Sequence, residues 1–181
     1  MRLLLLCHSF NSLAQRLWVE LAADGHDLSV EFDVNDRVTD EAVAAWQPDA
    51  IVAPFLKRRI ADEVWRRLTC LVVHPGIVGD RGPSALDWAL QEGAVEWGVT
   101  VLRANAEMDA GDVYATATFP LRAATKSSVY RNEVADAAVT AVREALAKLA
   151  AGVAPTPLAE TRSLAPSGEP AATARGRLRP L

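Results

Sequence analysis

The chain has 181 residues, half of them hydrophobic, and a formal net charge of −4. These values fit one globular domain with a sizeable core, and the small acidic excess does not favour nucleic acid as a partner. Both cysteines lie in apolar runs, which is typical of buried thiols rather than of a disulfide framework. No apolar run approaches the ~20 residues of a membrane span. We therefore expect a cytoplasmic protein that binds neither nucleic acid nor membrane.

Apolar runs and helical patterns alternate along the first 150 residues. The apolar start, residues 1–8, is too short for the hydrophobic region of a signal peptide and predicts a first buried strand. Leucines then recur at helical spacing, and Gly25 follows them as a stop signal. The predicted strands are residues 3–7, 28–34, 50–53, 70–73, 99–104 and 113–121, and the predicted helices are residues 12–23, 40–46, 60–68, 83–91 and 126–150.

This order of elements predicts an α/β fold with a Rossmann-like, open and mostly parallel sheet and helices on both faces. The last two strands are joined by a short acidic turn, residues 105–112, and are expected to run antiparallel at one edge. From about residue 153 the chain becomes rich in Pro, Ala and small polar residues. We therefore expect a folded domain at residues 1–152 and an irregular tail or linker at residues 153–181.

His74 stands at the end of the fourth predicted strand and is followed by a loop rich in glycine and proline, residues 75–83. The carboxyl ends of the strands are the ligand-binding edge of an open α/β sheet. A carboxylate beside a histidine can orient it for proton transfer near neutral pH, and the acidic turn offers two, Asp109 and Asp112. A lone histidine beside a strand is more often structural, but the shaped loop favours a functional role here.

Two other loops follow strands at the same edge. Ser9 and Asn11 precede a helix N-terminus that can hold an anion, although either side chain can instead simply cap the helix. Residues 54–59 combine Phe55 and Leu56 with three cations, so this loop either holds a flat acidic ligand or forms a solvated basic turn. No pair of histidines or cysteines has the spacing of metal ligands, and we predict no metal site.

Three segments carry a family resemblance: residues 72–79 read Val-Val-His-Pro-Gly-Ile-Val-Gly, residues 98–101 Gly-Val-Thr-Val and residues 108–111 Met-Asp-Ala-Gly. Together they resemble the signature of the formyltransferases that use 10-formyltetrahydrofolate, and the resemblance covers about residues 1–150. It implies a formyltransferase domain that takes its formyl group from 10-formyltetrahydrofolate. It also implies that His74 and Asp109 are the catalytic residues.

The loop of residues 55–59 falls where this family wraps the folate pterin, and with it we predict the other site residues. Those at the folate are Phe55, Leu56, Lys57, Arg58, Asn105 and Met108, and those of the substrate loops are Ser9, Asn11, Gly76, Gly79 and Arg81. The chain departs from the family at Val72, where the family has an asparagine that polarises the formyl carbonyl. Asn105 and the backbone amides of residues 76–79 are the candidates to replace that donor.

Longer strings give a narrower resemblance. Residues 7–12, 52–58, 73–88 and 126–133 resemble the N-terminal domain of hydrogenase maturation factors. This resemblance implies formyl transfer to the thiol of coenzyme A, and a second, enoyl-CoA hydratase-like domain that releases carbon monoxide as a ligand of the nickel–iron centre. Two alternatives stay open: formyl transfer to an amine acceptor, and a folate-binding module without turnover, which Val72 would favour.

Overall fold

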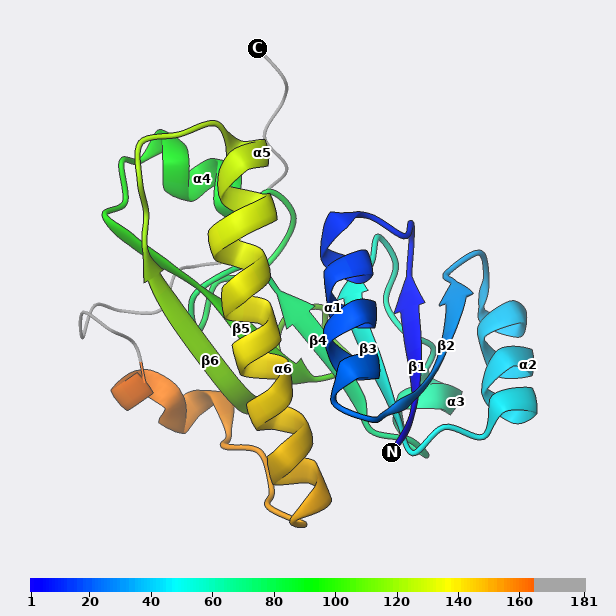
Figure 1. Ribbon diagram of the computed structural model, residues 1–181. Coiled ribbons are helices and arrows are strands. Elements are labelled where there is room, and N and C mark those ends of the chain that lie inside the picture. Colours follow the sequence, from blue (N-terminus) through cyan, green and yellow to red (C-terminus); the bar gives the residue numbers. More distant parts are fainter. Residues whose placement is uncertain (165–181) are drawn as a thin grey trace.

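The computed structural model describes residues 1–164, which fold around a six-stranded sheet with strand order β2-β1-β3-β4-β5-β6 (Figure 1). The strands are β1 (Arg2–Cys7), β2 (Asp27–Phe32), β3 (Ala50–Phe55), β4 (Cys70–His74), β5 (Glu96–Arg103) and β6 (Val113–Pro120). The helices are α1 (Ser12–Ala23), α2 (Asp36–Trp46), α3 (Asp62–Trp65), α4 (Ala85–Gln91), α5 (Lys126–Val129) and α6 (Ala135–Ala150). The predicted fold class is confirmed.

The sheet is parallel from β2 through β1 and β3 to β4, and antiparallel beyond. We predicted antiparallel pairing only between the last two strands. The structure has a second antiparallel pair, because β5 also runs antiparallel to β4. The reason is the connection between these strands. In Figure 1 the helix α4 lies beyond the carboxyl end of β4 instead of crossing back along a sheet face, so the chain re-enters the sheet from that end.

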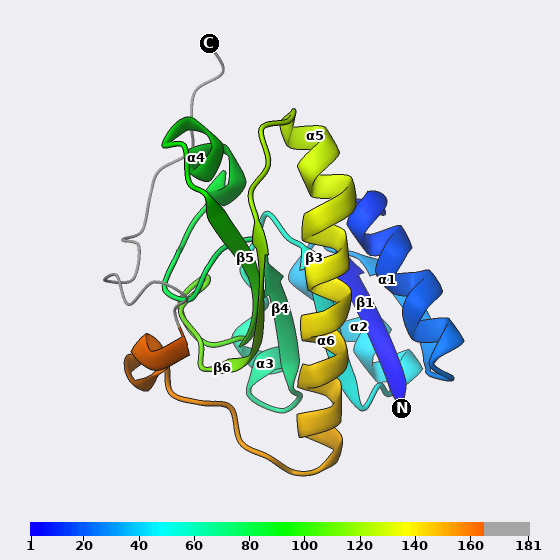
Figure 2. The same cartoon turned by 60° about the vertical axis from the view of Figure 1, so that its left-hand side comes forward.

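The first strand shows why both faces of the sheet are covered. Leu3 and Leu5 pack in the cluster that contains the buried side chains of α1 and α6, whereas Leu4 and Leu6 pack with those of α2 and α3. Side chains alternate between faces along a strand, so a run of four buried leucines requires helices on both sides. Figure 2 shows the sheet between these two helical layers.

Some element boundaries differ from the sequence prediction for local reasons. α2 begins earlier than predicted, at Asp36, because the side chain of Asn35 caps it by accepting a hydrogen bond from the backbone N–H of Val38 (3.0 Å). The predicted helix at residues 126–150 is divided by a π-helical turn, Tyr130–Val134, that lies between α5 and α6.

The first part of the predicted tail packs on the sheet. Thr156 and Val113 exchange two backbone hydrogen bonds of 2.8 Å, and a 3-10 helix, Leu158–Leu164, follows. Leu158 packs against a small cluster formed by Val78, Leu102 and Val113. The rest of the segment predicted as tail or linker, residues 165–181, lies outside the described residues.

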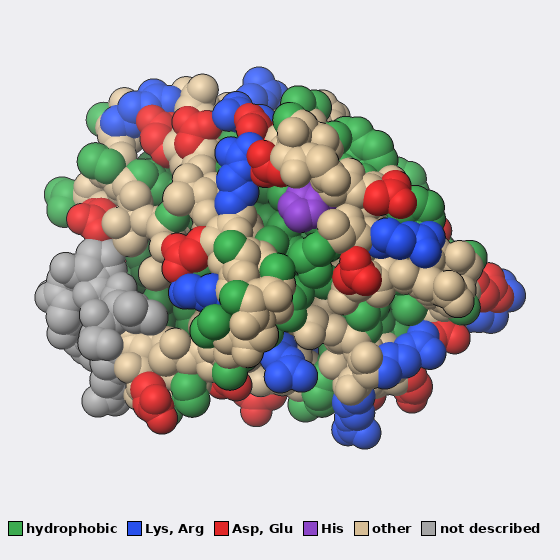
Figure 3. Space-filling model, turned by 60° about the horizontal axis from the view of Figure 1, so that its bottom comes forward, with side chains coloured by type: hydrophobic (Ala, Val, Ile, Leu, Met, Phe, Trp, Pro, Cys, Tyr) green, Lys and Arg blue, Asp and Glu red, His purple; other side chains and the backbone are tan. Residues whose placement is uncertain are grey.

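The distribution of charged side chains on the surface is consistent with the small net charge of −4. On the face of the molecule drawn in Figure 3, acidic and basic side chains are interspersed rather than gathered by sign. Within residues 1–164, no helix has the length and apolar character needed to cross a membrane.

Both cysteines are buried thiols, as predicted. Cys7 in β1 and Cys70 in β4 are 0% and 1% exposed. Burial raises the pKa of the Cys7 thiol to about 11, with a smaller contribution from the charge of Glu31, and burial raises that of Cys70 to about 12.

We expect neither thiol to react with an alkylating reagent at pH 8 in the folded protein, because each is inaccessible and almost entirely in the unreactive protonated form. Mass spectrometry should find no label under native conditions and two labels after unfolding in guanidinium chloride. Rapid single labelling of the folded protein would contradict the burial of these strands.

Candidate active site

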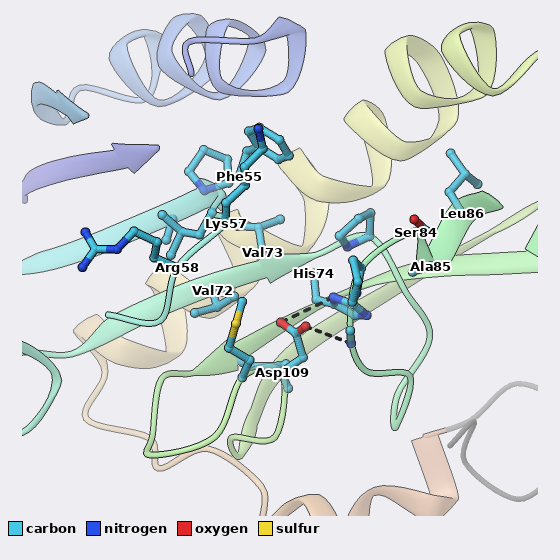
Figure 4. Close-up of a pocket in the computed structure, with 18 of the residues that line it drawn as sticks. Phe55, Lys57, Arg58, Val72, Val73, His74, Ser84, Ala85, Leu86 and Asp109 are labelled. Atoms are coloured by element: carbon cyan, nitrogen blue, oxygen red, sulfur yellow. Dashed lines mark hydrogen bonds and ion pairs between the residues drawn. The ribbon is translucent and has the colours of Figure 1, made fainter. Parts of the chain in front are cut away.

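The loops that follow β1, β3 and β4 surround a cavity of about 850 Å³, which is of a size that holds small-molecule ligands. The cavity lies at the carboxyl edge of the parallel strands, where ligands bind in open α/β sheets. Figure 4 shows side chains from the β3 loop, from β4 and its loop, and from the acidic turn after β5 pointing into this space. The apolar lining includes Phe55, Leu56, Ile60, Val72, Leu86, Leu102 and Met108, and the cations are Lys57, Arg58, Arg59, Arg103, Lys126 and Arg131.

His74, the last residue of β4, lies in the wall of the cavity between two carboxylates. Its Nε2 is 2.7 Å from Oδ2 of Asp80, and its Nδ1 is 3.5 Å from Oδ1 of Asp109. The three side chains are 5%, 1% and 10% exposed, respectively. The structure therefore brings together the histidine and the aspartate that the sequence singled out (Figure 4), and it adds a second carboxylate that the sequence analysis did not single out.

Asp109 occupies a tightly held position in the acidic turn. It adopts a left-handed conformation with φ 51°, and its Oδ2 accepts a hydrogen bond from the backbone N–H of Gly82 (3.1 Å). The side chain of Asn105 closes the turn by donating to the carbonyl of Ala110 (3.1 Å). Asp112 lies outside the cavity lining, and its carboxylate accepts from the backbone N–H of Leu158 (3.4 Å). Of the two candidate acids, Asp109 is the one that faces His74.

Gly111 allows this turn to press against β5. A Cβ atom at this position would lie 1.6 Å from the carbonyl oxygen of Arg103, a backbone atom that cannot move aside without shifting the strand. We expect Gly111→Ala to lower the free energy of unfolding by ~3 kcal/mol, the upper end of the usual overpacking range.

Urea unfolding followed by circular dichroism measures this effect. The control is Gly152→Ala, where a Cβ meets nothing within 4 Å and only the positive φ of 69° opposes the substitution, so that ~1 kcal/mol is expected. Equal losses in the two variants would show that the turn is not packed as described.

The basic loop after β3 is partly neutralised. Arg58 pairs with Asp33 (3.4 Å) and with Asp36 (2.6 Å), and Arg59 pairs with Asp62. Burial raises the pKa of Asp33, while the charge of Arg58 opposes that rise. Among residues 1–164, Lys57 makes no ion pair, and it lines the cavity. The loop is therefore a cavity wall that carries a free cation, not only a solvated turn.

The remaining predicted residues fall into two groups. Asn11, Asn105 and Met108 line the cavity. Asn11 also caps α1 by accepting from the N–H of Ala14 (3.0 Å), so its capping role is real, and its amide donates to the hydroxyl of Tyr130 (3.2 Å). Outside the lining are Ser9, Gly76, Gly79 and Arg81.

Contacts of the loop after β4 account for the positions of Gly76 and Arg81. The indole N–H of Trp97 donates to the carbonyl of Pro75 (3.0 Å), and the hydroxyl of Thr100 donates to the carbonyl of Gly76 (2.8 Å). These bonds hold Pro75 and Gly76 against β5. Pro75 still lines the cavity, whereas Gly76 faces the pair of His74 and Asp80, and Arg81 pairs with Glu107 (3.3 Å).

Three cavity residues from the segment around α5 were not predicted from the sequence. Lys126, Tyr130 and Arg131 line the cavity next to the π-helical turn, and Lys126 pairs with Asp87 (2.5 Å). Such turns are frequent at functional sites, but a π-helical turn leaves no clear signal in the sequence. In residues 1–164 no group of three or more His, Cys, Asp or Glu side chains is arranged to hold a metal ion.

Comparison with known proteins assigns the class. Residues 24–146, well over half of the chain, match the family model described as formyl transferase. The chain therefore belongs to the formyl transferase family.

Two relatives are closely similar over nearly the whole chain. The hydrogenase maturation factor HoxX of Bradyrhizobium diazoefficiens is 56% identical over 180 residues, which cover 99% of this chain and 31% of HoxX. The crystal structure of HypX from Aquifex aeolicus in complex with tetrahydrofolic acid superposes with a TM-score of 0.89 at 47% identity, over 99% of this chain and 30% of HypX. The chain thus spans less than a third of the length of these relatives.

A more distant structure shares the fold. Glycinamide ribonucleotide transformylase 1 from Symbiobacterium toebii superposes with a TM-score of 0.70 at 17% identity, over 84% of this chain and 88% of that one. At this identity the match concerns the fold alone. It places the six-stranded sheet among formyltransferase folds.

Proposed function

We propose that this chain transfers a formyl group from 10-formyltetrahydrofolate to the thiol of coenzyme A, in the cytoplasm. The reaction would be the first half of the synthesis of the carbon monoxide ligand in nickel–iron hydrogenase maturation. The observation that carries the proposal is a buried histidine between two carboxylates, in the wall of a cavity of about 850 Å³, in a chain of the formyl transferase family. The similarity to a HypX structure that contains tetrahydrofolic acid supports the donor.

The cavity lining fits a folate. Phe55, Leu56 and Met108 offer apolar surface for a flat heteroaromatic ring. Lys57 and Arg103 also line the cavity and make no ion pair within residues 1–164, so they are available to the carboxylates of a folate tail. When bound, the folate supplies the formyl group.

The catalytic work of the chain would fall on His74 and Asp109. Formyl transfer requires that charge developing on the carbonyl oxygen be stabilised and that a proton leave the attacking group. The imidazole ring of His74 can accept a proton on one nitrogen and donate one from the other, and Asp109 lies 3.5 Å from its Nδ1, within reach of a proton relay through the ring or a water molecule.

Val72 favours a thiol as acceptor. It lines the cavity two residues before His74 and provides no hydrogen-bond donor from its side chain. A thiol with a pKa of ~8.5 has a usable thiolate fraction near neutrality and needs less general-base help than an amine. The same residue is the observation that favours the second candidate, a folate-binding module without turnover.

The test is incubation of the chain with 10-formyltetrahydrofolate and coenzyme A, with tetrahydrofolate and formyl-CoA followed by mass spectrometry. We expect formyl-CoA above the uncatalysed background. Formylation of an amine in place of coenzyme A would refute the acceptor. Folate binding without product, also after addition of a separate enoyl-CoA hydratase-like domain as partner, would favour the binding module.

A further inference from the structure

We propose that Asp80 is a positioning residue that holds the ring of His74 by its Nε2, so that the Nδ1 edge beside Asp109 is the edge that exchanges protons in the cavity. The proposal deepens the proposed formyl transfer and rests on it. It divides the two carboxylates by role: Asp80 orients the ring, and Asp109 faces the reaction.

The contacts of the two carboxylates differ in the way this division requires. The Asp80 contact is the shorter, at 2.7 Å against 3.5 Å for Asp109. Asp80 is also the more deeply buried side chain, at 1% exposed against 10%, and only Asp109 lines the cavity. The shorter contact with His74 is therefore made by Asp80, the carboxylate that does not line the cavity.

The loop between His74 and Asp80 is built around their contact. A Cβ atom on Gly76 would lie 2.4 Å from Nε2 of His74 and 2.6 Å from Oδ2 of Asp80, so only glycine leaves room for the pair. The backbone N–H of Asp80 donates to the carbonyl of Ile77 (3.0 Å), which closes the turn beneath the ring. The bonds that Trp97 and Thr100 donate to this loop then fix it to β5.

The chemical consequence concerns the tautomer of His74. An ionised carboxylate only accepts hydrogen bonds, so the nitrogen that is hydrogen-bonded to Asp80 carries the proton. The contact of Nδ1 with Asp109 is longer, 3.5 Å, and is not a hydrogen bond, so Nδ1 is left as the site that gains and loses a proton. In the Ser-His-Asp triad of a serine protease a buried carboxylate also orients a histidine, and its replacement by asparagine leaves the geometry intact and lowers kcat by about 10⁴-fold. The geometry points to the same dependence here.

The experiment compares Asp80→Asn with the wild type by two readouts. The first is nitrogen-15 NMR of the imidazole rings, which is simple because the chain has three histidines, and His74→Gln assigns the signal. We expect the Nε2–H tautomer in the wild type and a shift towards Nδ1–H in Asp80→Asn. The second is steady-state kinetics, in which kcat should fall by ~10²-fold or more while KM for the folate changes by less than about threefold.

Two controls separate positioning from a structural role. Asp112→Asn makes the same substitution at an acid outside the cavity, and it should change neither the His74 signals nor kcat. Asp80→Asn should cause no further loss in a His74→Ala background, because Asp80 acts through the ring. If Asp80→Asn is less stable, kcat is expressed per folded molecule, with the folded fraction taken from circular dichroism.

An unchanged tautomer, or an unchanged kcat per folded molecule, would overturn the assignment of Asp80. A further loss in the His74→Ala background would overturn it as well. These results differ from failure of the proposed function, in which the wild type itself forms no formylated product while the NMR comparison still reports on the pair of His74 and Asp80.

Discussion

Replacement of His74 by alanine is expected to lower kcat for formyl transfer by ~10²–10⁴-fold, the range for loss of a general acid–base group. Among the described residues that line the cavity, His74 is the only histidine, and its ring lies between the two carboxylates. Folate binding should survive, because the apolar lining and the free cations of the cavity do not include this side chain. Rates and equilibrium binding of tetrahydrofolate, measured on the same preparation, test both expectations.

The alanine variant also leaves the carboxylate of Asp80 buried without its partner, which typically costs ~1–3 kcal/mol or more. His74→Gln separates the two effects, because its side-chain amide can still donate to Asp80 but cannot exchange a proton near neutral pH. We expect His74→Gln to match the alanine variant in kcat and to exceed it in stability.

His26→Ala is the matched control for these variants. His26 lies at the amino end of β2, the opposite edge of the sheet from the cavity, and its ring contacts the N-terminal amine at 3.3 Å. Its replacement should leave kcat within about twofold of the wild type, as is usual for changes remote from a site. Full activity in His74→Ala would show that this histidine is structural.

The fold could be predicted from the sequence because its main signals are local. Four consecutive buried leucines, the leucine spacing of α1 and the stop signals after the helices each depend on a few adjacent residues. The antiparallel pairing of β5 with β4 could not be predicted, because the direction of β5 depends on where α4 lies relative to the sheet. The early start of α2 did leave a signal, the capping residue Asn35.

The residues of the candidate site also differ in whether a local sequence signal could predict them. His74 could be singled out from its place at a strand end. The acidic turn by itself offered both Asp109 and Asp112, and only the family resemblance favoured Asp109. Asp80 could not be assigned from spacing, because the bonds from β5 decide which residue of the loop returns to the ring. Gly76, which we predicted as a substrate-loop residue, lies outside the cavity lining, and the absence of a Cβ atom there leaves room for the contact between His74 and Asp80.

Exchange of Asp109 for asparagine is the second change with a large expected effect, a loss of ~10²-fold in kcat. Asparagine keeps the shape of the side chain and can still accept the hydrogen bond from Gly82, but it removes the negative charge that faces Nδ1 of His74. Stability should hardly change, because asparagine tolerates the left-handed conformation that Asp109 adopts at φ 51°. A loss of activity in a fully folded variant is therefore the expected combination.

Asp112→Asn is the sharpest comparison, since it makes the same chemical change three positions further along the turn. The carboxylate of Asp112 contacts the backbone of Leu158 outside the cavity, so this variant should retain the kcat of the wild type. The reverse pattern, with Asp112→Asn inactive and Asp109→Asn active, would mean that the turn presents its other acid to the ring during the reaction. Equal losses in both variants would point instead to the net charge of the turn, because then neither carboxylate would owe its effect to the contact with His74.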